Sequence, residues 1–442
     1  MKKKLGRFDV LALVIGSIIG WGSFTLPGKQ FLAKSGVLNT TLGLIIGGVL
    51  VMIIQKVYHI MLLEHVEEGG EFTYTLKNLG RGHGFIVGWS LSLCYLSMIP
   101  LNASAYVLLF KVIFQDKFSF GYLYSIAGYP VYVTDVIIMS SVIIIFAYIN
   151  IRGLKLSSKV QNFMSFLLVI IVLVLVALIA IRSDLHTFNQ NYIANYNFSF
   201  AQIATVISIV PFLFVGFDVI PQVAKELKFK AHKATRLALI SIFLGVLIYA
   251  SLNVIAGLSF SGKEALQTNW AVADSVILKL GYIGFAFMLV ALWAAITGGI
   301  NGFMIASSKL IAALSEYKIM KSKYSIRNKN DAYPYAIIFV SGVSLIAPWI
   351  GREVIIYIVD MASVLAAVAY GYVSFISYNK AKNLMDKIMC ILAVGVSILF
   401  ILLLLVPFSP AMLSIPALIF LVLWTIFGFV IYLSQKKLKT NK

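Results

Sequence analysis

The stretch Gly16–Phe24, GSIIGWGSF, decides how the fold of this chain is interpreted. It places three glycines and two serines in the middle of a segment that is otherwise apolar and long enough to cross a membrane. Each glycine inside a helix costs about 0.5–1 kcal/mol relative to alanine. We therefore expect a loose backbone at this depth, and we expect it to serve the function of the protein.

The composition identifies the class of protein. Of the 442 residues, 60% are hydrophobic and 12% are charged, whereas soluble proteins carry about 25% charged residues. The apolar runs repeatedly reach the roughly 20 residues that span the hydrocarbon core of a lipid bilayer. The sequence therefore predicts an all-α integral membrane protein with twelve transmembrane helices, at about residues 8–32, 37–62, 84–113, 131–150, 157–181, 199–222, 236–259, 272–312, 334–350, 354–378, 386–407 and 411–434. The span that begins near residue 272 is unusually long, so we expect its C-terminal part to extend beyond the membrane.

The basic residues are distributed unevenly between the predicted loops. The net charge is +19, which in a soluble protein would suggest a nucleic-acid partner. If the N-terminus is cytoplasmic, 28 Lys and Arg residues fall on the cytoplasmic side, Lys279 falls within a span, and seven fall outside, namely Lys29, Lys34, Lys111, Lys117, Arg182, Lys263 and Arg352. Cytoplasmic loops are enriched in Lys and Arg. We therefore expect both termini in the cytoplasm and no nucleic-acid partner.

The sequence contains no arrangement typical of an enzyme. His59 and His65 flank Glu64, but a spacing of six puts them on different faces of a helix, whereas pairs on one face are three or four residues apart. The sequence has no phosphate-binding loop and no G-x-S-x-G nucleophile motif. We expect no catalytic residue, no metal and no cofactor, so transport is the leading class of function.

A second predicted helix is interrupted in the same way. Pro211, Gly216 and Pro221 lie within VPFLFVGFDVIPQVAKE, residues 210–226. Interrupted helices at corresponding positions of two halves indicate the binding site of a transporter, because irregular backbone at this depth is tolerated where it lines a cavity. Such breaks leave free amide donors and carbonyl acceptors. The alternative is that these small residues only allow close packing between helices.

Five motifs in sequence order resemble one family. They are GSIIGWGSFTLPG (16–28), EEGGEFTYTLKNLGRGHGFIVGW (67–89), INIRGLKLSSKVQN (149–162), FVGFDVIPQVAKE (214–226) and INGFMIASSKLIAAL (300–314). Together they cover most of residues 8–320 and resemble the amino acid–polyamine–organocation (APC) superfamily of secondary transporters. The last two predicted helices match that family only in hydropathy.

The resemblance implies a fold and an activity. The fold would be a single transporter domain (1–442) with a five-plus-five inverted repeat, whose first half is 8–181, whose second half is 199–378, and whose two peripheral helices are in 386–434. Helices 1 and 6 would be discontinuous. The activity would be amino acid transport across the plasma membrane by alternating access, with the cytoplasmic loop Glu64–His83 packed against the inner gate.

The resemblance also implies a substrate site between helices 1 and 6. The substrate-binding residues would be Ile18, Ile19, Gly20, Trp21, Gly22, Phe212, Leu213, Phe214, Val215 and Gly216. Amides at Gly20–Gly22 would bind a carboxylate, and carbonyls of Ile18 or Ile19 and of helix 6 would bind an ammonium group. Phe214 would be a gating aromatic or, alternatively, a packing residue.

Several polar residues within the predicted spans are candidates for gating or coupling. Asp218 is the clearest, because an acid within a span usually faces a cavity or a partner. Thr297 and Asn301 could line the path of an ion or substrate, although hydrogen bonding between helices is the commoner role of such residues. Asp135 and Asp360 are weaker candidates, since each lies near a predicted aqueous boundary.

Two departures from the family pattern leave the substrate and the coupling open. Trp21 replaces a small residue, which favours a small amino acid or offers an aromatic face to an amine. Leu168 stands where several relatives have a lysine in helix 5, so coupling to H⁺ through that lysine is doubtful. Coupling to Na⁺ and exchange without ion coupling stay open. A polyamine- or ethanolamine-type carrier, a substrate-sensing receptor and a channel are the alternatives to an amino acid transporter.

Overall fold

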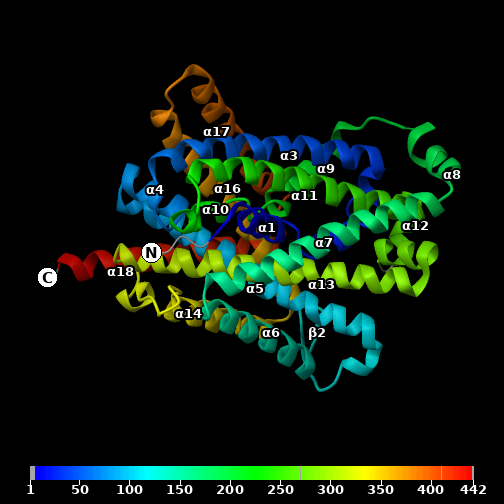
Figure 1. Ribbon diagram of the computed structural model, residues 1–442, viewed down its shortest axis with the longest axis horizontal. Helices are drawn as coiled ribbons and strands as arrows, with labels where there is room; N and C mark the ends of the chain where they lie inside the picture. Colours follow the sequence, from blue (N-terminus) through cyan, green and yellow to red (C-terminus); the bar gives the residue numbers. More distant parts are fainter. Residues whose placement is uncertain (1–4, 195, 269, 410, 441–442) are drawn as a thin grey trace.

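The computed structural model describes residues 5–194, 196–268, 270–409 and 411–440, and it is an elongated bundle of helices (Figure 1). Within these residues, nine helices are long and apolar enough to cross a membrane. They are α3 (Leu32–Glu64), α5 (Arg81–Phe114), α6 (Val133–Ile151), α7 (Leu154–Arg182), α11 (Ala234–Gly257), α13 (Ala271–Glu316), α16 (Arg352–Lys380), α17 (Leu384–Leu405) and α18 (Ile415–Thr440). Each coincides with one of the predicted spans.

The other three predicted spans are each divided into two shorter helices. These pairs are α1 (Arg7–Ile18) with α2 (Gly22–Thr25), α9 (Phe200–Leu213) with α10 (Val219–Gln222), and α14 (Pro334–Ser344) with α15 (Ala347–Ile350). The first two divisions lie at the predicted interruptions, around Gly20 and Gly216. The number of membrane crossings and the inverted repeat stay predictions, because none of these pieces alone is long enough to span hydrocarbon.

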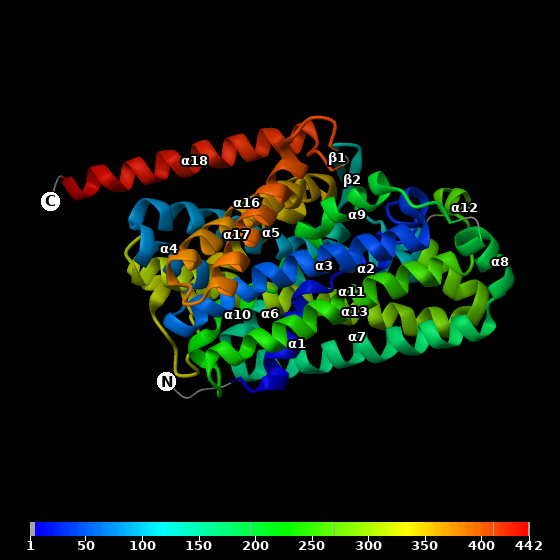
Figure 2. The same ribbon diagram turned by 90° about the horizontal axis from the view of Figure 1, so that it is seen from above.

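The interrupted helices lie inside the bundle. Eight of the twelve residues of α1 are buried, and α1 packs against α7, α11 and α13. By contrast, α18 lies at the periphery (Figure 2), where most of its large apolar side chains are exposed. Apolar surface of this extent fits the hydrocarbon of a bilayer rather than water.

Helix α13 is interrupted near its N-terminal end. Gly281 has φ 68° and ψ −167°, which is not helical, so Ala271–Leu280 is set off from the rest of the helix. The remaining 36 residues up to Glu316 would still extend about 54 Å at 1.5 Å per residue. This is longer than a hydrocarbon core of about 30 Å. We therefore still expect the C-terminal part of α13 to extend beyond the membrane.

The two ends of the bundle carry different small elements. One end, called the terminal end below, contains Leu5, α4 (Gly70–Leu79), η3 (Ala224–Glu226), η4 (Ala231–Lys233) and η5 (Ser322–Ser325). The opposite end contains η1 (Gln115–Phe118), α8 (Leu185–Asn189), η2 (Gln190–Ala194), α12 (Gly262–Gln267) and an antiparallel hairpin of β1 (Tyr122–Ile126) and β2 (Tyr129–Tyr132). Figure 1 shows α4 and α8 at the two ends.

The orientation in the membrane stays a prediction. Four of the basic residues that indicate a cytoplasmic terminal end, Lys2–Lys4 and Lys442, lie outside the described residues. Leu5 is held at this end by backbone hydrogen bonds with Glu226 (3.0 Å) and Lys228 (2.8 Å).

Candidate functional site

The first interruption exposes consecutive backbone donors. Helix α1 ends at Ile18, Ile19 is extended, and α2 begins at Gly22. Among the described residues, the N–H groups of Gly20, Trp21 and Gly22 donate no hydrogen bond to a protein acceptor, although the Gly20 carbonyl accepts from the Ser23 amide (3.2 Å). Buried backbone groups are almost always paired. Three unpaired neighbouring amides therefore form a site that an anionic group can occupy.

The second interruption exposes backbone acceptors. Helix α9 ends at Leu213, and the chain turns at Gly216, where φ is +117°. The carbonyls of Phe212, Leu213 and Val215 accept no hydrogen bond from another described residue, whereas the Phe214 carbonyl accepts one from Phe217 (3.3 Å). The three helix-6 carbonyls that the resemblance implies as acceptors, those of Phe212, Leu213 and Val215, are therefore available.

The two interruptions lie directly against each other. A side chain at Gly216 would place its Cβ 2.6 Å from the Cβ of Ser17, and a Cβ at Gly22 would lie 3.7 Å from the Phe212 ring. Only glycine satisfies both the positive φ and the close approach at position 216. The free donors of one break therefore face the same region as the free acceptors of the other.

On helix 1, the carbonyl of Ile19 is better placed for a substrate than that of Ile18. The Ile18 carbonyl already accepts a hydrogen bond from the Tyr249 hydroxyl (3.3 Å), whereas no described residue donates to Ile19. Phe214 is fully buried and tilted against the ring of Tyr249 at a centroid distance of 6.2 Å. The structure therefore places Phe214 in a packed position beside the site.

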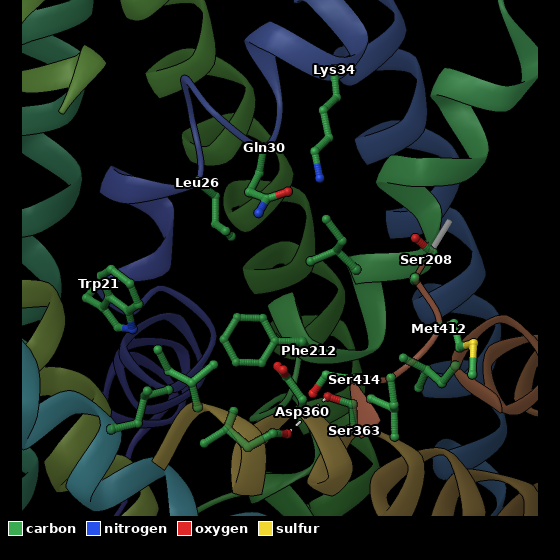
Figure 3. A pocket seen from close by; sticks show the side chains of 17 residues that line it. Trp21, Leu26, Gln30, Lys34, Ser208, Phe212, Asp360, Ser363, Met412 and Ser414 are labelled. Carbon is green, nitrogen blue, oxygen red and sulfur yellow. Dashed lines mark hydrogen bonds between the residues drawn. The ribbon is translucent and has the colours of Figure 1, made fainter. Parts of the chain in front are cut away.

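A cavity of about 450 Å³ opens beside the breaks. Trp21, Phe212 and Asp360 project into it from three different segments (Figure 3). Its size lies within the roughly 300–1,000 Å³ that is typical of small-molecule sites. Lys34 lines the same cavity on the side toward the opposite end. Asp360 forms no ion pair and no hydrogen bond with another described residue, so its carboxyl group is available to a ligand.

Sequence reasoning missed a cation that lies against the first break. Arg352 is 6% exposed, and its guanidinium lies 4.0 Å from the centre of the Trp21 ring. One of its nitrogens donates to the Ser104 hydroxyl and another has no partner. Arg352 was counted only as a charge outside the membrane, although an arginine at the start of an apolar span was a signal available in the sequence.

Thr297 and Asn301 are held by other helices. The Asn301 amide nitrogen donates to Gln161 (2.8 Å) and to the Ser157 carbonyl (3.0 Å), and its oxygen accepts from Asn150 (3.1 Å). Thr297 shares a hydrogen bond with Tyr106. These contacts explain the packing of α13 against α6, α7 and α5, and the participation of both residues in gating or coupling stays a prediction.

The predicted acids fall into different surroundings. Asp218 is fully buried and accepts hydrogen bonds from the Tyr95 hydroxyl (2.9 Å) and the Gly216 amide (2.9 Å). Asp135 pairs with Lys111 at 2.9 Å and does not line the cavity beside the breaks. Asp218 is thus tied to the second break, and Asp135 is not part of the site.

The terminal end contains a largely buried ion network. Lys309 on α13 bonds Glu68 (3.0 Å) and Glu226, and Arg327 lies 2.7 Å from Glu68 and 3.7 Å from Glu226. The Tyr333 hydroxyl donates to Glu68. Burial alone would raise the pKa of Glu68, but Lys309, Tyr333 and Arg327 together hold that pKa below its ordinary value.

This ion network joins segments that are far apart in sequence. It connects the loop before α4, η3 after the second break, α13, and the loop before α14. Glu68 belongs to the predicted loop Glu64–His83, which therefore packs against the other segments of this end. We call these five residues the gate network.

No metal site is visible in the described part of the chain, which contains no group of three His, Cys, Asp or Glu residues that could hold an ion. His59 contacts the His232 carbonyl and the Thr235 hydroxyl, both at 3.2 Å. His65 lies 3.5 Å from Glu67. The two histidines therefore have separate partners.

Comparison with known proteins decides the family. A family model described as "Amino acid permease" matches residues 5–432. The chain belongs to the amino acid permease family. This permease is 22% identical to the branched-chain amino acid permease BcaP of Bacillus subtilis over 468 residues, covering 100% of the chain and 95% of that protein.

Other relatives show the range of the family. The serine/threonine exchanger SteT of Bacillus subtilis is 25% identical over 395 residues, which cover 87% of this permease and 85% of SteT. An arginine/ornithine antiporter of Latilactobacillus sakei is 23% identical over 351 residues, which cover 77% and 71% of the two chains. The relatives are transporters and not enzymes. Together with the long apolar helices, the family makes this permease a multi-pass plasma-membrane protein that transports amino acids.

Proposed function

We propose that this permease moves a small amino acid by alternating access and holds the substrate between its two interrupted helices. The substrate carboxylate would occupy the free amides of Gly20, Trp21 and Gly22. Its ammonium group would donate to the free carbonyls of Ile19 and of the second break. The observation that carries this proposal is the close approach of unpaired donors on one helix to unpaired acceptors on the other.

The geometry favours an α-amino acid. An α-amino acid carries its carboxylate and ammonium groups on one carbon, so both can be satisfied only where donors and acceptors lie side by side. Trp21 and Phe212 both border the cavity, and their rings restrict the room left for the substrate side chain. This supports a small amino acid rather than a large one.

Arg352 argues against a carrier of simple amines. The face of Trp21 that could have received an amine is stacked on the Arg352 guanidinium. A buried cation at this place attracts the carboxylate and repels a second positive charge. A polyamine or ethanolamine would leave the amides of Gly20–Gly22 without an anionic partner, and such a carrier is therefore the less favoured alternative.

The closed gate network and the cavity support alternating access. The network buries two acids and Lys309 at the terminal end and pairs them with the half-buried Arg327. The cavity, in contrast, lies between the breaks and Lys34 at the opposite side. With the terminal end in the cytoplasm, this arrangement is closed to the inside. Twelve helices, with an inverted repeat of 8–181 and 199–378 and peripheral helices in 386–434, complete the proposed architecture.

A binding experiment with matched ligands tests this proposal. The shift in thermal stability of the purified protein is measured with L-serine against ethanolamine and with L-valine against isobutylamine, because each pair differs only in the carboxylate. We expect at least one amino acid to bind at least 10-fold more tightly than its amine. Equal binding within every pair, or binding of amines alone, would contradict the carboxylate site.

A glycine pair supplies the variants for the same assay. Gly20→Leu adds a side chain whose Cβ starts 3.1 Å from Asn102, beside the free amides, and we expect it to abolish binding. The same change at Gly395 on α17, where a Cβ meets no atom within 4 Å, is the control and should leave binding intact.

A further inference from the structure

Two buried carboxyl groups lie between the second break and α4. Glu71 and Asp218 are both 0% exposed. Asp218 accepts from Tyr95 and from the Gly216 amide, while one oxygen of Glu71 accepts from the side-chain amide of Gln222 (2.8 Å). The segments that carry them pack together, since α4 contacts α10. We call Glu71 and Asp218 the carboxyl pair.

The carboxyl pair has no neutralising cation among the described residues. Among the described residues, neither acid forms an ion pair with a Lys, Arg or His side chain. The titratable groups that face the pair from the surrounding elements are all acids, namely Tyr58 on α3, Tyr74 on α4, Cys94 and Tyr95 on α5, and Tyr370 on α16. Two adjacent buried carboxylates without a cation are strongly unfavourable, and such pairs retain a proton.

A buried polar atom beside Glu71 supports a ligand at this place. The side-chain oxygen of Gln222 is buried and has no hydrogen-bond partner among the described residues, while the second oxygen of Glu71 shares a hydrogen bond with the Tyr58 hydroxyl. Tyr58 is fully buried and interacts with both acids. Burial first, and the charge of Asp218 second, raise the pKa of Glu71.

We propose that the carboxyl pair is a proton-binding site, with the proton on Glu71, and that this proton is the ion whose transport is coupled to that of the amino acid. The coupling rests on the proposed function, whereas the binding of the proton does not. In the closed arrangement the neutral Glu71 carboxyl group donates to the hydroxyl oxygen of Tyr58. On release, its O–H bond breaks, the proton passes to water, and the Glu71 carboxylate remains.

The position of Glu71 links proton release to the gate network. Glu68 of the network and Glu71 of the pair are three residues apart, and so the same segment carries both. Gly70, with φ +45°, sits so close to α10 that a Cβ would be 2.6 Å from the Cβ of Pro221. The facing segment carries a partner of each site, because Gln222, which bonds Glu71, and Glu226 of the gate network are four residues apart. Separation of Glu68 from Glu226 therefore also separates Glu71 from Gln222 and admits water to Glu71.

Infrared spectroscopy of the reconstituted protein tests the proton site without reference to transport. At pH 7 we expect a carbonyl band of a protonated carboxyl group that Glu71→Gln removes. Glu67→Gln changes the same chemical group in the same segment, but Glu67 is partly exposed and paired with Lys77, so this control should retain the band. If Glu71→Gln does not fold, Asp218→Asn is examined, and its protonated-carboxyl band should shift. A spectrum unchanged by the folded variants would overturn the proposal.

Transport in proteoliposomes tests the coupling. The probe is a mixture of labelled L-serine, L-threonine, L-valine and L-leucine, with an inward proton gradient, an inward sodium gradient or no gradient. We expect the proton gradient to increase uptake by about 10-fold in the wild type and in Glu67→Gln, and to have no effect in Glu71→Gln, which should still exchange internal for external substrate. Stimulation by sodium alone, or a proton response that persists in Glu71→Gln, would contradict the coupling. If the wild type takes up none of these amino acids, the proposed function fails, and the infrared result still decides the proton site.

Discussion

The gate network makes a quantitative prediction for Lys309→Met. Lys309 is 6% exposed and is in contact with both Glu68 and Glu226. Methionine has a similar length but no charge, so the change leaves two buried acids with Arg327 as their cation. Arg327 lies 2.7 Å from Glu68 and 3.7 Å from Glu226, and so it compensates Glu68 better than Glu226.

The magnitude follows from the burial of these charges. Removing one partner of a buried ion pair costs about 3–5 kcal/mol, and the remaining contact of Arg327 places the loss near 3 kcal/mol. This loss applies to the closed arrangement, because water solvates both acids when the terminal end is open. At about 1.4 kcal/mol per factor of ten, the variant should shift the equilibrium toward the open arrangement by roughly 100-fold.

Cysteine labelling measures that shift. Ala313 is fully buried on α13, directly against Gly69 of the loop before α4, so a cysteine at position 313 reacts with a maleimide when this loop moves away. The background lacks the native thiols of Cys94 and Cys390. We expect Lys309→Met to increase the labelling rate by up to about 100-fold, and the exposed Lys329→Met to leave it unchanged. A folded Lys309→Met protein with an unaltered labelling rate would refute the role of the network as a gate.

Three further predictions concern the breaks and the network. Arg352→Met should weaken amino acid binding by about 10-fold. It should also increase the stability in thermal unfolding by about 1–2 kcal/mol, since a buried cation without an acidic partner is removed from the face of Trp21. A less stable variant with unaltered affinity would contradict this prediction. Gly216→Ala should destabilise the protein by at least about 1–3 kcal/mol in thermal unfolding, because φ is +117° and the new Cβ would meet Ser17 at 2.6 Å. The pKa of Glu68 is lowered from its ordinary value of 4.5, so the ionised carboxylate stabilises the folded protein at pH values above 4.5. This stabilisation is lost as the pH falls through the lowered pKa. Glu68→Gln should remove this acid-dependent loss of stability in a thermal scan.

The sequence predicted the helices and their interruptions because both depend on local properties. Apolar runs of sufficient length identify spans, and glycine or proline within them identifies breaks, as at Gly20 and Gly216. The two backbone sites follow from these breaks, and the structure brings them together. Hydropathy contains no signal for α4 or for the hairpin of β1 and β2, since these elements lie outside the long apolar runs.

The side-chain partners could not be predicted, because they depend on tertiary contacts. Lys309 and Glu68 are 241 residues apart, and nothing in either local sequence identifies the other as its partner. The resemblance marked Trp21 as a departure from the family pattern, but the sequence alone did not show that Arg352 lies against its ring. Asn301 shows the reverse case: it is a polar residue on an apolar helix, and two other helices, α6 and α7, hold it by hydrogen bonds.

Uptake of labelled amino acids into proteoliposomes tests the central claim most directly. The mixture of L-serine, L-threonine, L-valine and L-leucine is presented to vesicles that contain the wild type, Gly20→Leu or Gly395→Leu. The account predicts saturable uptake by the wild type and by Gly395→Leu, and none by a folded Gly20→Leu protein. Normal uptake by Gly20→Leu would contradict a substrate site at the interrupted first helix.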